Sequence, residues 1–312
     1  MFVHEYPVFR TAMSSRGGTV HFVETEIISQ PDCWRRAVTL APDSLPAPGE
    51  RVAVIGCGTS WFVAQSYAQL REAAGQGETD AFAASEFPFS RRYDRVVAIT
   101  RSGTTTEVLD ALDRLRGQTP TLALIGDPDT PIVDKANELV VLDFADERSV
   151  VQTRFATTAL ALLRASLGED LGRAIADVEL AVVEPLDEEL FDVEQFTFLG
   201  RGWTNGLALE AGLKMREAAG AWTEAYPAME YRHGPISITG PNRMAWMFGT
   251  APEGLPEQVA ATGGRFRAGD RDPMAELVTV QRLAVAIALD QGLDPDQPRH
   301  LTRSVVLRGV DQ

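Results

Sequence analysis

Hydroxyl-bearing residues gather behind a β-branched run at 95–100. The turn at 100–106 reads Thr-Arg-Ser-Gly-Thr-Thr-Thr and combines five hydroxyls with the cation Arg101 and the flexible Gly103. An amphipathic pattern follows, so these groups would lie at the positive end of a helix, where phosphate binds readily. The turn has no Gly-Lys-Ser/Thr and is not a P-loop. An N-cap cluster would use the same residue types, but five hydroxyls exceed what one cap needs. The pattern therefore favours a phosphate site.

A second turn, Gly56-Cys57-Gly58-Thr59-Ser60, follows the apolar run at 51–56. Glycines let a backbone turn sharply and approach a ligand, and in open α/β sheets ligands bind at the carboxyl ends of the strands. A tryptophan stands where a dinucleotide fingerprint needs its third glycine, which argues against NAD. On its own the motif fits a ligand site and a plain strand-to-helix turn equally well.

Three charged residues share one face of the predicted helix at 204–219. Glu210, Lys214 and Glu217 follow an i, i+4, i+7 spacing, which places two carboxylates and an ammonium on one stripe. A carboxylate held beside another charge can act as a general base. A solvated face with an ion pair has the same spacing, and the helix alone favours that simpler interpretation.

His233 precedes Gly-Pro at the end of the segment Glu-Tyr-Arg-His, in a chain with only four histidines. Its imidazole is a candidate acid or base because it titrates near neutral pH. A histidine packed in a loop is an equally good interpretation of these residues.

Alternating strands and helices predict the elements that position these groups. Strands are expected at 51–56, 95–100, 121–126 and 139–144, and again at 196–200 and 243–249, with a further short segment at 265–268. Helices are expected at 24–41, 61–74, 104–115, around 131–137, in two pieces within 150–189, and at 204–219, 256–262 and 273–291. This alternation is typical of parallel sheets covered on both faces.

A weak internal duplication, in which 55–58 parallels 199–202, indicates two similar halves. We predict an α/β fold with two three-layer αβα sandwich domains, at 24–190 and 191–312, behind an irregular leader at 1–23.

The composition of the chain limits the kinds of partner and cofactor that it could bind. The hydrophobic fraction of 45% supports a normal core, and the net charge of −15 disfavours nucleic acid. Two cysteines, Cys33 and Cys57, provide neither a disulfide framework nor a cysteine-rich metal site. The longest apolar stretch is too short to span a bilayer and no secretion signal is evident, so we expect a cytoplasmic protein without membrane contact, metal or cofactor.

These motifs together resemble the sugar isomerase (SIS) family. Within it, the likeness is to the isomerase half of the glutamine–fructose-6-phosphate amidotransferases, and it extends from about residue 24 to 307. It rests on GCGTS, ITRSGTTTEVL, ALEAGLKMREA, TEAYPAMEYRHGP and DPDQPRHLTRSV.

The resemblance implies roles for single residues. The hydroxyls of Thr100, Ser102 and Thr105 would hold the phosphate of a hexose 6-phosphate, with the neighbouring turn of Cys57, Gly58, Thr59 and Ser60 beside it. Glu217 would shuttle the proton between C1 and C2, with Glu210 and Lys214 as its companions. His233 would open the sugar ring from across the interface of a homodimer, and Val150 and Gln152 would line the sugar.

Three departures from the family pattern bear on the chemistry. We expect no glutaminase half, and so no internal source of ammonia from glutamine. Arg303 replaces a lysine that forms a Schiff base, and a guanidinium stays protonated and cannot form an imine. Arg101 replaces a glutamine in the phosphate turn, where the added positive charge would favour phosphate and alter the fit of the sugar.

Three functions follow from this set. The first is isomerisation and deamination of a 2-amino-sugar 6-phosphate of the glucosamine 6-phosphate type, in which Glu217 removes the C2 proton and an enediol or enolamine forms. The second is a dehydratase that expels the C3 hydroxyl from N-acetylglucosamine 6-phosphate. The third is a non-catalytic sugar-phosphate sensor, which would have no need for Glu217 and His233.

Overall fold

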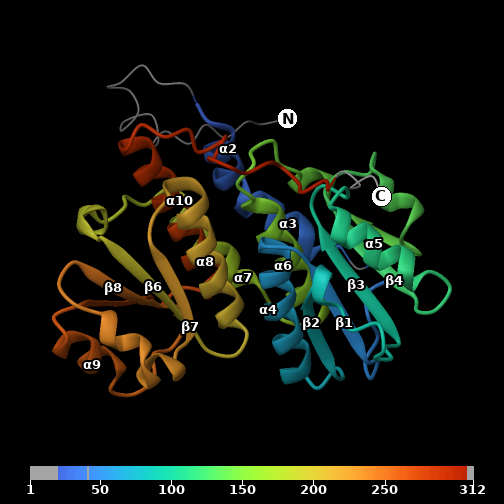
Figure 1. The fold of residues 1–312 in the computed structure, drawn as a ribbon, viewed down its shortest axis with the longest axis horizontal. Helices are drawn as coiled ribbons and strands as arrows, with labels where there is room; N and C mark the ends of the chain where they lie inside the picture. Colours follow the sequence, from blue (N-terminus) through green and yellow to red (C-terminus); the bar gives the residue numbers. More distant parts are fainter. Residues whose placement is uncertain (1–19, 41, 308–312) are drawn as a thin grey trace.

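Two parallel sheets form the framework of the protein in the computed structural model, which describes residues 20–40 and 42–307 (Figure 1). The first sheet has five strands in the order β2-β1-β3-β4-β5, and every neighbouring pair is parallel. Its strands are β1 (Val52–Gly56), β2 (Thr79–Ala83), β3 (Arg95–Thr100), β4 (Thr121–Ile125) and β5 (Glu138–Val141).

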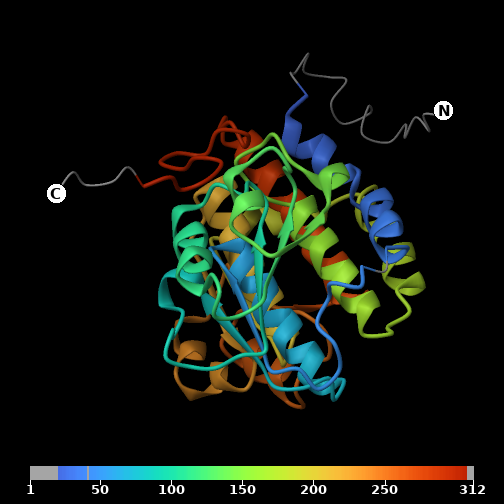
Figure 2. The same cartoon turned by 90° about the vertical axis from the view of Figure 1, so that its right-hand side faces the viewer.

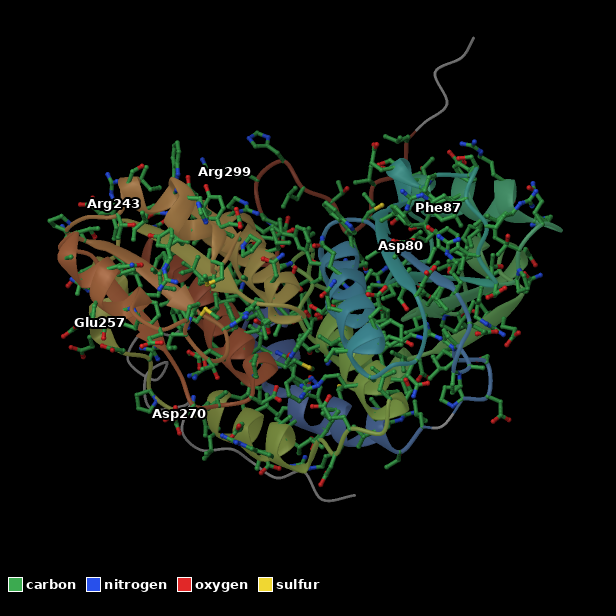
Figure 3. All side chains as sticks on the ribbon, turned by 90° about the horizontal axis from the view of Figure 1, so that it is seen from below. Asp80, Phe87, Arg243, Glu257, Asp270 and Arg299 are labelled. Atoms are coloured by element: carbon green, nitrogen blue, oxygen red, sulfur yellow. The ribbon has the colours of Figure 1, made fainter. Side chains whose placement is uncertain are left out.

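The second sheet repeats this arrangement with four strands in the order β7-β6-β8-β9, again all parallel. Its strands are β6 (Gln195–Gly200), β7 (Thr223–Pro227), β8 (Arg243–Met247) and β9 (Arg265–Ala268). Figure 3 shows the two halves from below, with Asp80 and Phe87 on the first and Arg243, Glu257 and Asp270 on the second.

Helices fill the space between the sheets and cover their outer faces (Figures 1 and 2). The inner layer packs into one continuous apolar core with the facing sides of both sheets. It comprises α2 (Phe22–Ile28), α3 (Gln30–Val38), α4 (Thr59–Ala73), α6 (Arg154–Ser166), α7 (Gly172–Ala181), α8 (Thr204–Ala219) and α10 (Pro273–Asp290). Helix α5 (Thr106–Leu115) closes a second core on the outer face of the first sheet, and α9 (Leu255–Ala261) does so on the second sheet. The predicted α/β fold with two parallel sheets is confirmed.

The structure corrects several predicted elements. The helix expected at 24–41 is two helices, separated at Ser29, and the one expected near 131–137 is the 3₁₀ helix η2 (Pro131–Asp134). Helix α6 begins at residue 154 rather than 150. Strands β2 and β7 were not predicted, because their sequences TDAFA and TEAYP lack the β-branched runs of the central strands.

The predicted division at 190 coincides with the 3₁₀ helix η4 (Glu188–Asp192) between the two sheets, and stays a prediction. Of the leader expected at 1–23, residues 1–19 lie outside the described part, whereas Phe22 and Val23 already belong to α2. No helix in the described part of the chain is long and apolar enough to cross a membrane.

Helices α4 and α8 join the two halves by close contact. Gly206 of α8 lies against α4, where a methyl group at its Cα would come within 2.3 Å of the Ser66 hydroxyl and 2.4 Å of the Phe62 carbonyl oxygen. The Ser66 hydroxyl donates to the Trp203 carbonyl at 2.8 Å. The small residue therefore lets the two helices approach until their backbones nearly touch.

The chain beyond α10 returns across the molecule from the second half to the first (Figures 1 and 2). Asp296 accepts hydrogen bonds from the amides of Phe22 and Val23, which ties this return to the start of α2. Residues 301–307, which we call the C-terminal strap, then lie along the start of α5: the Thr106 amide donates to the Val305 carbonyl, and the Leu307 amide donates to the Thr106 hydroxyl.

We predict that Gly206→Ala destabilises the protein although alanine is the better helix former. The added methyl group would overpack the α4–α8 contact, at a cost of about 1–3 kcal/mol, and denaturant unfolding measures it. Gly240→Ala is the matched control, since no atom lies within 4 Å of the position its methyl group would take. Equal stability of the two variants would contradict the close contact.

Candidate functional site

A pocket of about 190 Å³ opens at the carboxyl ends of β1 and β3. The chain leaves β1 toward β2 on one side, while β3 lies on the other, so this is the point where the strand order reverses and a crevice forms. The pocket is lined by Cys57, Gly58, Thr59, Ser60, Ile99, Thr100, Arg101, Ser102, Thr105, Val108, Val150, Gln152, Glu217, Leu301, Thr302, Arg303, Ser304 and Val305.

The hydroxyl-rich turn forms one wall. Gly103 takes a positive φ of 61°, and a side chain there would collide with Thr130, its β-carbon 2.1 Å from the Thr130 hydroxyl. The glycine does not line the pocket, but it makes the turn possible. The Ser102 hydroxyl accepts from the amide of Thr104 at 3.3 Å and lies 3.1 Å from the Thr104 hydroxyl. The turn thus presents Thr100, Ser102 and Thr105 to the pocket.

The glycine turn after β1 forms the floor. Gly58 has a φ of 53°, and Gly56 lies so close to the start of α4 that a β-carbon would come within 2.7 Å of the Ser60 backbone. Thr59 and Ser60 are therefore brought under the pocket at the first turn of α4. Burial raises the pKa of the Cys57 thiol to about 11, so this side chain is not a thiolate near neutral pH.

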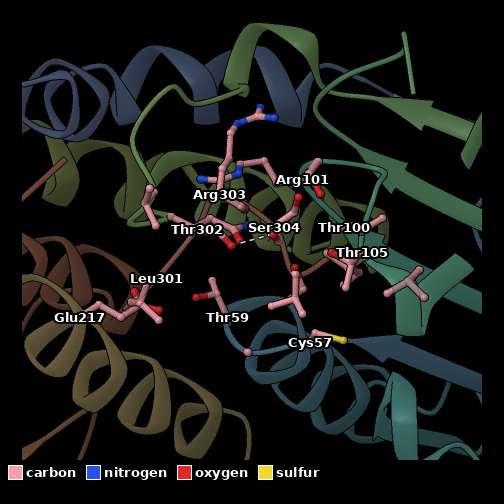
Figure 4. Close-up of a pocket in the computed structure, with 18 residues that line it drawn as sticks. Cys57, Thr59, Thr100, Arg101, Thr105, Glu217, Leu301, Thr302, Arg303 and Ser304 are labelled. Atoms are coloured by element: carbon pink, nitrogen blue, oxygen red, sulfur yellow. Dashed lines mark hydrogen bonds between the residues drawn. The ribbon is translucent and has the colours of Figure 1, made fainter. Parts of the chain in front are cut away.

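Glu217 stands on the opposite wall (Figure 4). It projects from α8, with its side chain about one fifth exposed, and forms an ion pair with Lys214. Lys214 also lies 3.5 Å from Glu210, whose other neighbour is the Thr59 hydroxyl, a donor at 3.3 Å. The predicted stripe of α8 is therefore not a solvated face: Glu210 and Lys214 are each only 1% exposed.

Burial shifts the pKa values of Glu210 and Lys214, the two charged residues behind Glu217. It raises the pKa of the Glu210 carboxyl to about 8, and the charge of Glu217 adds to this, while Lys214 and Thr59 oppose it. Burial disfavours the charged form of Lys214, but the surrounding carboxylates outweigh this and raise its pKa overall. The amine stays an ammonium, a counter-charge for Glu217 and not a nucleophile.

The two arginines of the pocket are engaged with the protein. The Arg101 guanidinium donates to the carbonyls of Ser149 at 3.1 Å and Arg303 at 2.8 Å, and lies 3.6 Å from the carboxylate of Glu147. Arg303 forms an ion pair with Asp146 at 2.5 Å and donates to the Glu147 carbonyl at 3.0 Å. Both guanidinium groups are thus paired with carbonyls and carboxylates of the protein itself.

Most of the predicted site residues meet in one place. Val150 and Gln152 line the pocket, whereas Glu210 and Lys214 lie behind Glu217. His233 ends the 3₁₀ helix η5 (Glu230–His233), is exposed, and does not line the pocket.

Six lining residues were not predicted from the sequence. Four belong to the C-terminal strap, whose motif DPDQPRHLTRSV was the available signal: Leu301, Thr302, Ser304 and Val305. The other two are Ile99 of β3 and Val108 of α5.

The second sheet has a cavity at the matching edge, of about 760 Å³, at the carboxyl ends of β6, β8 and β9. The turn after β6 repeats the positive φ of its glycine, 58° at Gly202 against 53° at Gly58. The stretch after β8, at 248–251, contains the single hydroxyl of Thr250 in place of the five found after β3. The internal duplication is therefore structural, while the hydroxyl-rich turn belongs to the first half.

Comparison with known proteins agrees with this fold. The chain is 26% identical over 351 residues to the isomerising glutamine–fructose-6-phosphate aminotransferase of Methanothermobacter thermautotrophicus, and 25% identical over 358 residues to that of Escherichia coli K12. These matches cover 95% and 92% of the chain, which spans 59% of the length of either relative. No family model matches the sequence.

Solved structures give the same result. A glucosamine-6-phosphate deaminase from Thermotoga maritima has a TM-score of 0.77 at 25% identity, covering 91% of this chain and 99% of its own. A tagatose-6-phosphate ketose/aldose isomerase from Escherichia coli has the same fold, with a TM-score of 0.74 at 17% identity, covering 95% of this chain and 98% of its own. This is an α/β protein with two parallel sheets, as in tandem SIS domains. It resembles the isomerase part of the glutamine–fructose-6-phosphate aminotransferases, as the motifs predicted.

The raised pKa of Glu210 predicts a pH-dependent stability. The folded state binds this proton more tightly than the unfolded chain, in which the carboxyl has its ordinary pKa of 4.5. Stability is therefore fullest below that value and falls as the pH rises toward 8. Glu210→Gln removes this loss, so its unfolding free energy minus that of wild type should grow between about pH 5 and about pH 8.

Denaturant unfolding at both pH values measures the difference. The exposed Glu257→Gln serves as the control and should follow wild type throughout. A difference between Glu210→Gln and wild type that stays constant over this range would show that Glu210 titrates normally.

Proposed function

We propose that the protein is a phosphosugar enzyme that acts on an amino-hexose 6-phosphate. In this proposal it opens the sugar and removes the proton at C2, giving isomerisation and deamination of the glucosamine 6-phosphate type. The observation that carries it is the pairing of a hydroxyl-rich turn after β3 with a carboxylate, Glu217, on the opposite wall of one pocket. The likeness to a glucosamine-6-phosphate deaminase supports this choice of substrate.

In the proposed complex the phosphate lies at the turn of Thr100, Ser102 and Thr105, with Ser60 beside it. Hydroxyl and amide donors suit an oxyanion, and a helix start favours its charge. This matters in an acidic chain, because the net charge of −15 would otherwise repel a phosphate dianion. The open-chain sugar would extend from the turn toward Glu217 on α8.

The proposed reaction begins when the Glu217 carboxylate takes the proton from C2 of the open-chain aldehyde. The electrons form a C1–C2 double bond and the C1 oxygen gains a proton, which gives an enolamine. Reprotonation at C1 then leaves an imine at C2. Water adds to this imine and ammonia departs, so one aminosugar phosphate and one water yield one ketose phosphate and one ammonia.

Lys214 supports this role by its position. Its ammonium is held between Glu210 and Glu217 and provides the positive charge beside the base, and it has no freedom to form an imine. Arg303, in the position of the family's Schiff-base lysine, is bound to Asp146. The proposed route therefore proceeds without a covalent link between enzyme and sugar.

His233 belongs to the proposal through a second copy of the chain. It is exposed on its own protomer and does not line the pocket that contains Glu217. We propose a homodimer in which each protomer supplies His233 to the neighbouring pocket as the group that opens the ring.

We predict that purified protein releases ammonia and a ketose phosphate from glucosamine 6-phosphate. Glu217→Gln keeps the size and hydrogen bonds of the side chain but cannot accept the proton. It should lower turnover by about 10²–10⁴-fold while sugar phosphate still binds. Enzyme-coupled ammonia detection measures turnover, isothermal titration measures binding, and the exposed Glu257→Gln should match wild type in both.

Other outcomes of this experiment select the alternatives. A product with ultraviolet absorbance from N-acetylglucosamine 6-phosphate, without ammonia, would replace deamination by dehydration. Binding without turnover of either sugar, unchanged in Glu217→Gln, would make the protein a sensor.

A further inference from the structure

Arg101 is a buried cation in the wall of the pocket. Its side chain is 3% exposed, although it sits in a turn that faces the pocket. Its two terminal nitrogens donate to the carbonyls of Ser149 and Arg303, which belong to two separate segments. The guanidinium therefore bridges the phosphate turn, the loop at 146–154 and the C-terminal strap.

Glu147 is the counter-charge that makes this burial possible. Its carboxylate is fully buried and lies 3.6 Å from Arg101 through one oxygen. The other oxygen accepts from the Thr153 hydroxyl at 2.7 Å and from the Arg154 amide at 2.8 Å. One glutamate thus fixes the loop that carries Val150 and Gln152 and, at the same time, the guanidinium that reaches the strap.

The strap has few other ties to the rest of the protein. Its outer residues are largely exposed, with Val305 at 50%, Val306 at 62% and Leu307 at 58%. It is attached by the Thr104–Ser304 hydroxyl pair at 2.9 Å, by the start of α5, and by the Arg303 side chain, which reaches back to Asp146 and to the Glu147 carbonyl. Within the described residues, the bond from Arg101 to the Arg303 carbonyl joins the strap to a buried, charged donor.

We propose that Arg101 is a positioning residue. Paired with Glu147, it holds the C-terminal strap in place as a wall of the pocket and does not itself bind the phosphate. This inference rests on the proposed function and deepens it. It gives Arg101 a part in building the sugar site, whereas its positive charge alone would point to direct binding of the phosphate.

The guanidinium suits this task by its shape. It is planar and carries donors in a rigid fork, so one side chain can donate to two carbonyls while its charge lies 3.6 Å from the Glu147 carboxylate. A lysine would keep the charge beside Glu147 but not the fork. The Nε–H of Arg101 has no partner in the described part of the chain and is shielded from solvent, while both terminal nitrogens are engaged by protein.

Trypsin provides a test that needs neither substrate nor turnover. Cleavage after Arg303 requires the strap to leave the pocket, so its rate, followed by mass spectrometry under native conditions, reports the open population. We predict that Arg101→Gln raises this rate roughly tenfold or more, since it removes a charge-assisted hydrogen bond to the strap. Arg95→Gln is the matched control: it removes a cation paired with Glu50 at the other end of β3 and should leave the rate unchanged.

A second pair of variants separates positioning from simple stability. Arg101→Gln alone leaves Glu147 buried without its cation, so the melting temperature of this variant should fall. The double variant Arg101→Gln/Glu147→Gln removes that unpaired charge and should recover much of the melting temperature, yet still be cut rapidly after Arg303. Recovery of both quantities together would reduce Arg101 to a structural ion pair and overturn the proposal.

Ligand binding then distinguishes a positioning role of Arg101 from direct binding of the phosphate. With Arg101→Lys, binding of inorganic phosphate should stay within about twofold of wild type, while KM for glucosamine 6-phosphate rises about tenfold, because the wall over the sugar is loosened. Loss of inorganic phosphate binding with a normal cleavage rate would make Arg101 a phosphate ligand instead. If wild type turns over no sugar, the proposed function fails, while the trypsin result still decides the role of Arg101.

Discussion

The packing of the two halves around the site depends on a lysine ammonium that is buried in the interior. Lys214 is 1% exposed, and a charge so placed is costly unless opposite charges surround it. Glu217 provides the opposite charge from the same helix. Glu210 lies 3.5 Å from the ammonium and accepts a hydrogen bond from the Thr59 hydroxyl of the other half of the molecule. The arrangement therefore requires α8 to lie against the start of α4.

Small residues make this approach possible. Gly206 brings the backbone of α8 onto α4, and Gly56 brings the start of α4 onto the end of β1. Both contacts leave no room for a β-carbon, so the position of Glu217 relative to the turn after β1 is fixed by packing. Because the phosphate turn follows β3, the strand paired directly with β1, the same two contacts align the base with the proposed phosphate site.

The central elements could be predicted from the sequence because local pattern and burial agree there. The β-branched runs of β1, β3 and β4 are fully or almost fully buried, and α8 has the bounds that its pattern indicated. Strands β2 and β7 escaped prediction because they lie at sheet edges, where polar residues and Pro227 weaken the strand signal.

Long-range contacts limited the prediction of the site. The motifs supplied the hydroxyl turn, the glycine turn and Glu217, and the resemblance supplied their order around a sugar. Nothing local indicates that Arg101 turns toward Glu147 and the Arg303 carbonyl, 202 residues away along the chain. The burial of the charged stripe on α8 also depends on a partner, Thr59, that is 151 residues away.

The proposed site is tested most directly by a crystal structure of the Glu217→Gln variant with glucosamine 6-phosphate. The phosphate group should accept hydrogen bonds from the turn at 100–105, and the substituted side chain of position 217 should face C2 of the sugar. A phosphate bound elsewhere, such as in the cavity at the edge of the second sheet, or a sugar whose C2 faces away from α8, would contradict it.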